Sequence, residues 1–253
     1  MRFASAATAL VGAALLFAPV ARAETAPDPA LKAQVEGIVR DYLLAHPEIL
    51  IEMTTKLEAQ RAAEEAAEAR NLIRAEKQAL FEGPGQVVLG NPDGDVTLVE
   101  FFDYNCGYCR QASGDLARLI ESDKNLRVVL KEFPVLGEGS VEAAQVAVAV
   151  NRVAPERYGP FHYALLHSSG QANRAAAIAA AEKAGVDRKA LDKALADSAG
   201  INAELQKSYG LATRLGLTGT PSWVVGPEII VGAVGVDNLK QKISNARACG
   251  TEC

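Results

Sequence analysis

Cysteine, excess positive charge and long apolar stretches are all scarce in this chain of 253 residues. Four cysteines are too few to build a fold from disulfides, and residues 24–253 are enough to bury a core without such links. We therefore expect the cysteines to carry chemistry. The formal net charge of −5 shows no excess of basic residues, so nothing supports a nucleic-acid partner, and we predict none.

One apolar run stands at the amino end. Residues 3–20 are largely apolar, and the tripeptide Ala-Arg-Ala follows at 21–23, a pattern typical of a cleaved secretory signal peptide. A single membrane anchor is the alternative, but the run is short and rich in Ala and Gly. No later stretch reaches the roughly 18 apolar residues of a spanning helix. We therefore predict a signal peptide at 1–23 and a soluble mature protein in the periplasm.

Glycine and proline are nearly absent from residues 31–80, where strong helix formers dominate. This composition predicts two helices separated at His46-Pro47, because the residue before a proline is pushed out of the helical region. The first helix has a continuous apolar stripe, whereas the stripe of the second fades over residues 61–70. The stripes consist of Leu31, Val35, Ile38 and Tyr42 in the first helix and of Leu50, Met53 and Leu57 in the second.

This helical pair has no core of its own, so its apolar stripe must be buried against something else. Two interpretations fit: a solvated connecting helix, or an arm whose apolar face meets the same face of another copy of the chain. We favour an oligomerisation arm with its linker at residues 24–85. The turn sequence Gly-Pro-Gly at 83–85 marks its predicted end.

From residue 86 the pattern changes to short β-rich runs and helical segments. A run at 96–102 leads into a cysteine pair, a helix reaching about residue 122 and a strand at 127–132, a strand-helix-strand unit whose crossover should be right-handed. The other expected elements are a strand at 86–89, helices at 140–153, 156–167, 172–184, 188–196 and 201–215, strands at 222–225 and 228–231, and a helix at 237–247. This order predicts an α/β fold.

The cysteine pair is the motif Cys106-Gly107-Tyr108-Cys109, which at the start of a helix beside a strand is typical of a thioredoxin-like redox centre. Unpaired backbone N–H groups and the helix dipole stabilise an anion there, so we expect Cys106 to be the nucleophilic thiolate. Cys109 then resolves a mixed disulfide with the substrate. Gly107 and Tyr108 tune the oxidising strength of the Cys106–Cys109 disulfide. The redox-active disulfide is itself the reaction centre, so we predict no cofactor.

The other two cysteines, in the C-terminal tail 249–253, have a different spacing. A zinc site that joins Cys249 and Cys253 to the motif lacks the paired spacing of zinc knuckles, and we predict no metal site. A purely structural disulfide between Cys106 and Cys109 would be unusually strained. Cys249 and Cys253 are close enough for a local disulfide, and a free or second redox pair is the alternative.

Three features together resemble the DsbA-type thiol-disulfide oxidoreductases. They are residues 99–109, Val-Glu-Phe-Phe-Asp-Tyr-Asn-Cys-Gly-Tyr-Cys, the helices inserted after the strand-helix-strand unit, and the tripeptide Gly-Thr-Pro at 219–221. The resemblance implies a thioredoxin fold at 86–248 that is interrupted by a helical subdomain at about 140–215. The N-terminal helical arm precedes it.

The resemblance also assigns residues to a substrate site and a proton acceptor. It implies that Pro221 is cis and that the backbone of Thr220 pairs with an extended substrate segment. Strand alternation from Leu98 points Glu100 inward beneath the motif, where a desolvated carboxyl could accept the proton of Cys109. A strand-end glutamate that faces solvent is the alternative.

Residues 41–50, Asp-Tyr-Leu-Leu-Ala-His-Pro-Glu-Ile-Leu, are similar to the amino-terminal region of the suppressor-of-copper-sensitivity protein C group (ScsC). This similarity implies a homotrimer formed through residues 24–85 and a disulfide isomerase that acts on misfolded or thiol-containing exported proteins. A membrane thiol reductase would keep Cys106 reduced. Isomerisation also agrees with a physical argument, since several reduced sites in one assembly face a misfolded chain at high effective concentration. The sequence departs from that group at Gly107, where proline is common.

Three other functions stay open. The same dithiol could act as an oxidase that introduces disulfides. It could instead bind copper in a copper-tolerance protein, because soft thiolates suit Cu(I). A trimeric chaperone-like clamp with incidental cysteines is the third.

Overall fold

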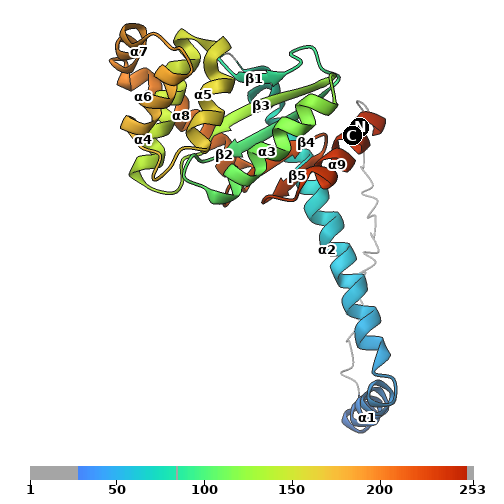
Figure 1. The fold of residues 1–253 in the computed structure, drawn as a ribbon. Coiled ribbons are helices and arrows are strands. Elements are labelled where there is room, and N and C mark those ends of the chain that lie inside the picture. Colours follow the sequence, from blue (N-terminus) through green and yellow to red (C-terminus); the bar gives the residue numbers. More distant parts are fainter. Residues whose placement is uncertain (1–27, 84, 250–253) are drawn as a thin grey trace, which may run out of the picture. The chain divides into compact units, whose positions relative to one another are not determined.

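The computed structural model describes residues 28–83 and 85–249, and the predicted signal peptide at 1–23 and Cys253 lie outside these residues. The chain divides into two compact units, Met1–Leu57 and Glu58–Cys253. Within the described ranges no helix is both long and apolar enough to cross a membrane. Figure 1 shows the elements with the labels used below.

Helix α1, Pro29–Ala45, belongs to the first unit. It begins where the Asp28 side chain accepts a hydrogen bond from the N–H of Ala30 at 3.0 Å, with Pro29 in the first turn, and it ends at Ala45, just before His46 and Pro47. No residue of α1 is buried. The predicted stripe is present but uncovered: the exposed fractions are 55% for Leu31, 49% for Val35, 62% for Ile38 and 57% for Tyr42.

Helix α2, Glu48–Ala75, is followed by a short π-helix, η1, Gln78–Glu82, which was not expected from the sequence. Ile73 and Leu80 in this region are buried in the core of the second unit. The Lys131 ammonium donates to the carbonyl of Ala79 at 2.8 Å, and the Gln86 amide donates to the same carbonyl at 3.2 Å. Packing therefore makes the last part of the predicted arm a piece of the second unit, which starts near residue 58 rather than 86.

The second unit contains a five-stranded mixed sheet in the order β1-β3-β2-β4-β5. Strands β2 and β3 are parallel and flank the crossover helix α3, whereas the other neighbours are antiparallel. The elements are β1 Val87–Gly90, β2 Val96–Phe102, α3 Gly107–Ser122, β3 Leu126–Glu132, β4 Ser222–Val225 and β5 Glu228–Val231. The expected strand-helix-strand unit is confirmed.

Residues of alternate strand positions fill two cores, one on each face of the sheet. One face carries Leu98 and Phe102 of β2 and packs against α3, the helical insertion and the last helix, α9 (Val236–Cys249). The other carries Val99 and Phe101 and packs against the end of α8 (Ser198–Arg214) and the Ile73 and Leu80 region. Because both faces are covered, β2 is apolar along nearly its whole length.

The helical insertion between β3 and β4 is confirmed. It comprises α4 Glu138–Val153, the 3-10 turn η2 Pro155–Arg157, α5 Tyr158–Leu166, α6 Arg174–Lys183, α7 Arg188–Leu195 and α8 Ser198–Arg214, gathered beside the sheet in Figure 1. Helix α4 starts two residues earlier than expected, after Gly137, whose φ of 110° suits glycine. Three of the helices begin at an Asn or Asp side chain that caps the first turn: Asn173, Asp187 and Asp197.

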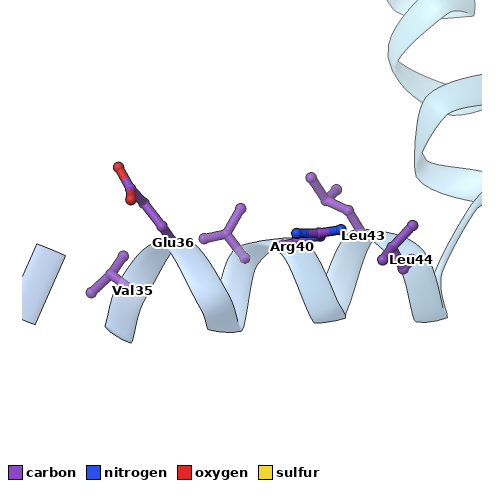
Figure 2. A pocket seen from close by; sticks show the side chains of 6 residues that line it. Val35, Glu36, Arg40, Leu43 and Leu44 are labelled. Atoms are coloured by element: carbon purple, nitrogen blue, oxygen red, sulfur yellow. The ribbon is translucent and has the colours of Figure 1, made fainter. Parts of the chain in front are cut away.

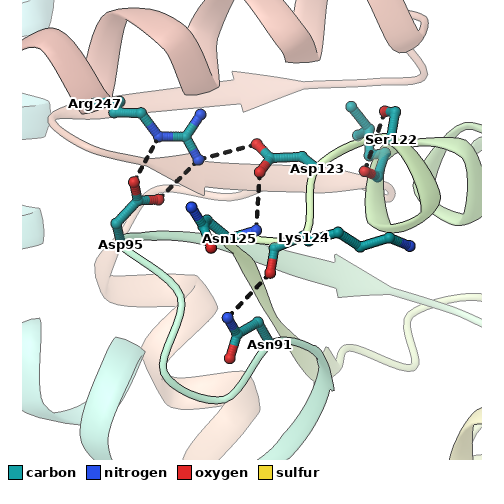
Figure 3. A network of polar contacts seen from close by, with 8 residues as sticks. Asn91, Asp95, Ser122, Asp123, Lys124, Asn125 and Arg247 are labelled. Carbon is teal, nitrogen blue, oxygen red and sulfur yellow. Dashed lines mark hydrogen bonds and ion pairs between the residues drawn. The ribbon is translucent and has the colours of Figure 1, made fainter.

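The last helix, α9, Val236–Cys249, is tied to two turns of the sheet by one arginine. The Arg247 guanidinium donates to Asp95 at 2.7 and 2.9 Å and to Asp123 at 2.9 Å, as Figure 3 shows. Asp95 lies in the turn before β2, and Asp123 follows α3. Cys249 is the last described residue, so its pairing with Cys253 stays a prediction.

Candidate active site

The two cysteines of the motif lie at the start of α3, after β2. Cys106 is the residue that precedes the helix, with extended φ and ψ of −80° and 117°, and its carbonyl accepts from the N–H of Arg110 at 3.1 Å. Both cysteines are free thiols. Cys106 keeps 7% of its surface exposed, whereas Cys109 has none. A partner can therefore reach Cys106 first.

The loop before β4 faces Cys106. The peptide bond between Thr220 and Pro221 is cis, as the resemblance implies. The Cys106 thiol donates a hydrogen bond to the carbonyl oxygen of Thr220 at 3.2 Å. Cys106 and Thr220 are 114 residues apart in the sequence. They meet because β4, which follows Thr220, pairs with β2, which precedes Cys106.

Glu100 is buried in the middle of β2, with 2% of its surface exposed. Its sheet partners are Leu130 on β3 and Trp223 on β4, two residues of the apolar core on the motif side. Burial raises the pKa of this carboxyl from 4.5 to about 8, and its Oε2 atom has no hydrogen-bond partner among the described residues. The inward orientation predicted from alternation is confirmed.

Cys109 and Glu100 interact electrostatically. Burial raises the pKa of the Cys109 thiol far above its usual value, and the charge of Glu100 raises it further. Cys109 therefore holds its proton until a neighbouring group accepts it. The arrangement offers an accessible sulfur, a buried second thiol and a buried carboxyl on the same side of the sheet.

The two residues between the cysteines face outward. The Tyr108 side chain is 67% exposed, and a side chain added at Gly107 would meet open space. A Cβ atom at position 107 would therefore meet no steric obstacle. Both residues are available to a docked partner.

Two polar residues that precede the motif were not singled out from the sequence. The buried carboxylate of Asp103 accepts from the N–H groups of Asn105, Val135 and Leu136 at 2.8 to 2.9 Å and so holds the loop after β3 against the motif. The side chain of Asn105 exchanges two hydrogen bonds with Ala172, each 2.8 Å long. In the sequence, Asp103 and Asn105 are only two short polar residues between a strand and a helix, a pattern typical of any turn.

Tyr104, between them, enters a buried polar cluster that sequence reasoning also missed. Its hydroxyl lies 3.1 Å from the hydroxyl of Tyr158 and 3.2 Å from Nδ1 of His162, and Tyr158 donates to Glu132 at 2.7 Å. These residues come from three separate segments, so no local pattern could join them.

Among residues 28–83 and 85–249, no group of three or more His, Cys, Asp or Glu side chains could hold a metal ion. Zinc ligation through the tail cysteines would need Cys253, which lies outside these ranges.

The sequence and the fold both resemble those of known proteins. The family model for the DSBA-like thioredoxin domain matches residues 97–244, which include the strand-helix-strand unit, both cysteines and the cis proline. The chain belongs to the DSBA-like thioredoxin family. The model for the copper resistance protein ScsC N-terminal domain matches residues 32–64. A search of the curated proteins found no match.

Solved structures agree with this DSBA-like assignment. A thioredoxin-like oxidoreductase from Silicibacter pomeroyi is 41% identical, with a TM-score of 0.63 over 68% of this chain and 97% of that one. Proteus mirabilis ScsC in a compact conformation is 30% identical, with a TM-score of 0.64 over 87% of this chain and 99% of that one. The thiol-disulfide exchange protein α-DsbA2 of Wolbachia pipientis is 28% identical, with a TM-score of 0.67 over 72% and 97%.

The match to ScsC extends into the helices before the thioredoxin fold, whereas the match to the Silicibacter protein covers a smaller part of the chain. The chain therefore combines the fold of a DsbA-like thiol-disulfide oxidoreductase with an ScsC-type amino-terminal segment.

Proposed function

We propose that this chain is a periplasmic protein disulfide isomerase that works as an oligomer, most simply a homotrimer. The observation that carries the proposal is the uncovered apolar face of α1 on a chain that also has the Cys106 and Cys109 pair at the start of α3. Leu31, Val35, Ile38 and Tyr42 are all about half exposed, and a large exposed apolar patch marks an interaction site.

Figure 2 shows a shallow hollow on α1 between apolar side chains, with Val35, Leu43 and Leu44 labelled. Glu36 and Arg40 also line it. A second copy of the same helix offers apolar side chains for such a hollow, together with opposite charges for Glu36 and Arg40. The similarity of residues 32–64 to the ScsC amino-terminal domain supports the same occupant.

The chemistry begins with attack of the Cys106 thiolate on a wrong disulfide of an exported protein. A mixed disulfide forms, and the released substrate thiolate can attack elsewhere in the substrate until the native pairing is reached. Cys109 resolves a stalled mixed disulfide and passes its proton to Glu100, while the backbone of Thr220, Gly107 and Tyr108 hold the substrate segment. A membrane thiol reductase returns the dithiol to its reduced form, and no bound cofactor takes part.

The test compares oligomeric state with activity. The deletion should remove residues 24–57 and keep 58–85, because Ile73 and Leu80 belong to the core of the catalytic unit. We expect the mature protein to have the mass of a trimer and the deletion variant that of a monomer. The monomer should still reduce insulin but lose most reactivation of scrambled ribonuclease.

A point variant separates the apolar face from the length of the arm. Ile38→Glu places a charge within the stripe, whereas Ala33→Glu places the same charge roughly 200° round the helix from Leu31. We expect only Ile38→Glu to dissociate the oligomer. A monomeric wild-type protein, or a deletion variant with full reactivation, contradicts the oligomeric mechanism. Strong oxidase activity with no reactivation, unchanged by the deletion, contradicts the isomerase proposal. Stoichiometric Cu(I) binding without turnover of a dithiol would favour copper binding instead.

A further inference from the structure

Four buried polar side chains form a continuous chain of hydrogen bonds through the interior of the catalytic unit. The Tyr158 hydroxyl donates to Oε1 of Glu132 at 2.7 Å, and its oxygen lies 3.1 Å from the hydroxyl of Tyr104. The Tyr104 hydroxyl also lies 3.2 Å from Nδ1 of His162. At least nine-tenths of each of these four residues is buried. Buried polar chains of this kind are costly unless fully paired, so this one needs a physical explanation.

One end of this hydrogen-bond chain, at Glu132, opens to a cavity. Glu132 and Tyr158 both line a cavity of about 640 Å³, whose wall also carries the charged side chains of Lys131, Glu204, Lys207 and Arg214. Burial holds the pKa of Lys131 down to about 8, and this residue is adjacent to Glu132 in β3. The cavity therefore provides groups that take up and release protons.

Tyr104 is the member of this hydrogen-bond chain that connects it to the cysteine motif. Tyr104 is two residues before Cys106, and the charges of both Glu100 and Glu132 act on its hydroxyl, raising its pKa further above the usual value than burial alone. Glu100 and Glu132 come from adjacent parallel strands, in which Glu100 pairs with Leu130 and Phe102 pairs with Glu132. Tyr104 is thus coupled to both buried carboxyls.

Glu100 needs a route for protons. With a pKa of about 8 it carries a proton at neutral pH, so it must lose this proton before it can accept that of Cys109. Only 2% of its surface is exposed, and its Oε2 atom has no hydrogen-bond partner among the described residues. Direct release to solvent is therefore obstructed.

We propose that Tyr104, Tyr158 and Glu132 carry protons between Glu100 and the cavity that Glu132 lines. The inference rests on the proposed role of Glu100 in thiol-disulfide exchange. A proton leaves Glu100, through a water or a rotation of its side chain, to the Tyr104 oxygen. Each hydroxyl gives up its own proton as it receives one, and Glu132 releases a proton to the cavity as its Oε1 atom receives the last one from Tyr158.

The route serves the step in which Cys109 resolves the mixed disulfide between Cys106 and the substrate. Cys109 loses its proton to the deprotonated Glu100, and its sulfur attacks the Cys106 sulfur of the mixed disulfide. The bond between Cys106 and the substrate sulfur breaks, and a Cys106–Cys109 disulfide forms. The substrate leaves as a thiolate, reduced by the two electrons that the dithiol gives up.

His162 positions Tyr104 within this hydrogen-bond chain and does not itself carry protons. Burial lowers its pKa to about 3, so it stays neutral and holds the Tyr104 hydroxyl in place rather than storing a proton. Its ring stacks on that of Tyr158, with centroids 5.9 Å apart.

The pKa of Glu132 is raised by burial, and the charge of Asp103, after β2, raises it further.

The experiment measures single-turnover resolution of a preformed mixed disulfide by stopped flow, in H₂O and in D₂O, on the full mature chain. Tyr158→Phe removes the bridging hydroxyl and keeps the ring, whereas Glu132→Gln keeps the hydrogen-bond acceptor and removes the carboxyl. Tyr163→Phe is the matched control, since Tyr163 is on the same helix and is 54% exposed.

We expect Tyr158→Phe and Glu132→Gln to slow resolution on the order of tenfold, less than the 10²- to 10⁴-fold of a direct proton acceptor, and to enlarge the solvent isotope effect. The reactivity of Cys106 toward an alkylating reagent should not change. Both variants must give the same far-ultraviolet circular dichroism as the control. A variant that fails to fold is replaced by Tyr104→Phe, for which the same slowing is expected.

Rates and isotope effects equal to those of Tyr163→Phe would overturn the proton route. This outcome is distinct from failure of the proposed function, in which the wild-type chain would not reactivate scrambled ribonuclease.

Discussion

The thiol of Cys106 donates a hydrogen bond to the carbonyl oxygen of Thr220, 3.2 Å away, in the loop of the cis proline. The same carbonyl belongs to the backbone that we propose pairs with an extended substrate. When Cys106 loses its proton, this hydrogen bond is lost and the carbonyl becomes available. Activation of the sulfur and opening of the substrate site are therefore linked at one atom.

The first prediction separates the two cysteines. Cys106→Ser should abolish insulin reduction, because no other thiol in the described part of the site is exposed to attack first. Cys109→Ser should still attack substrates but should accumulate mixed disulfides, which non-reducing gels and mass spectrometry detect. Undiminished function of Cys106→Ser would favour the chaperone-like clamp.

The second prediction concerns the dependence of stability on pH. Folding raises the pKa of Glu100 to about 8, so between about pH 4.5 and 8 the folded state keeps a proton that the unfolded state has lost. The free energy of unfolding contributed by Glu100 therefore falls as pH rises through this window, by about 5 kcal/mol at about 1.4 kcal/mol for each pKa unit.

Glu100→Gln removes this dependence. We expect the variant to gain stability relative to the wild type as pH increases from 5 to 8, measured by urea unfolding at a series of pH values. Glu121→Gln, an exposed change on α3, is the control. Parallel stability curves for wild type and Glu100→Gln would show that this carboxyl titrates as if it were in water.

Local patterns predicted much of this fold, and they failed where distant segments meet. Alternation from Leu98 was sufficient to place Glu100 inside, because a strand covered on both faces leaves little choice of side. The inclusion of Ile73 and Leu80 in the catalytic core could not be predicted in this way, since the stripe before them had already faded into alanines. The cluster of Tyr104, Tyr158 and Glu132 likewise depends on how the insertion packs.

The third prediction tests that missed boundary. Leu80→Ala removes a side chain with no exposed surface, so we expect it to cost about 2 to 5 kcal/mol in the free energy of unfolding. Lys77→Ala, an exposed change three residues earlier, should alter stability by no more than about 0.5 kcal/mol. Chemical unfolding of the chain that lacks residues 24–57 measures both. Equal small effects would mean that this segment does not belong to the catalytic unit.

The last prediction concerns the arginine that ties α9 to the turns of the sheet. The hydrogen bonds and positive charge of Arg247 lower the pKa of Asp95, and they bind Asp123 in the same network. Arg247→Gln should therefore return the Asp95 pKa toward its ordinary value, as an NMR titration of the side-chain carboxyl would show. Lys240→Gln, on the same helix, removes an equal charge without touching the network and is the control.

The sign of the accompanying effect on stability follows from the lowered pKa. The contribution of Asp95 to stability is present above the pKa of the unfolded state and is lost as pH falls through the folded-state value. The difference between wild type and Arg247→Gln should therefore shrink in acid, and it should also shrink at high salt, because these groups are partly exposed. A difference that persisted under both conditions would mean that Arg247 acts through packing of its stem rather than through its charge.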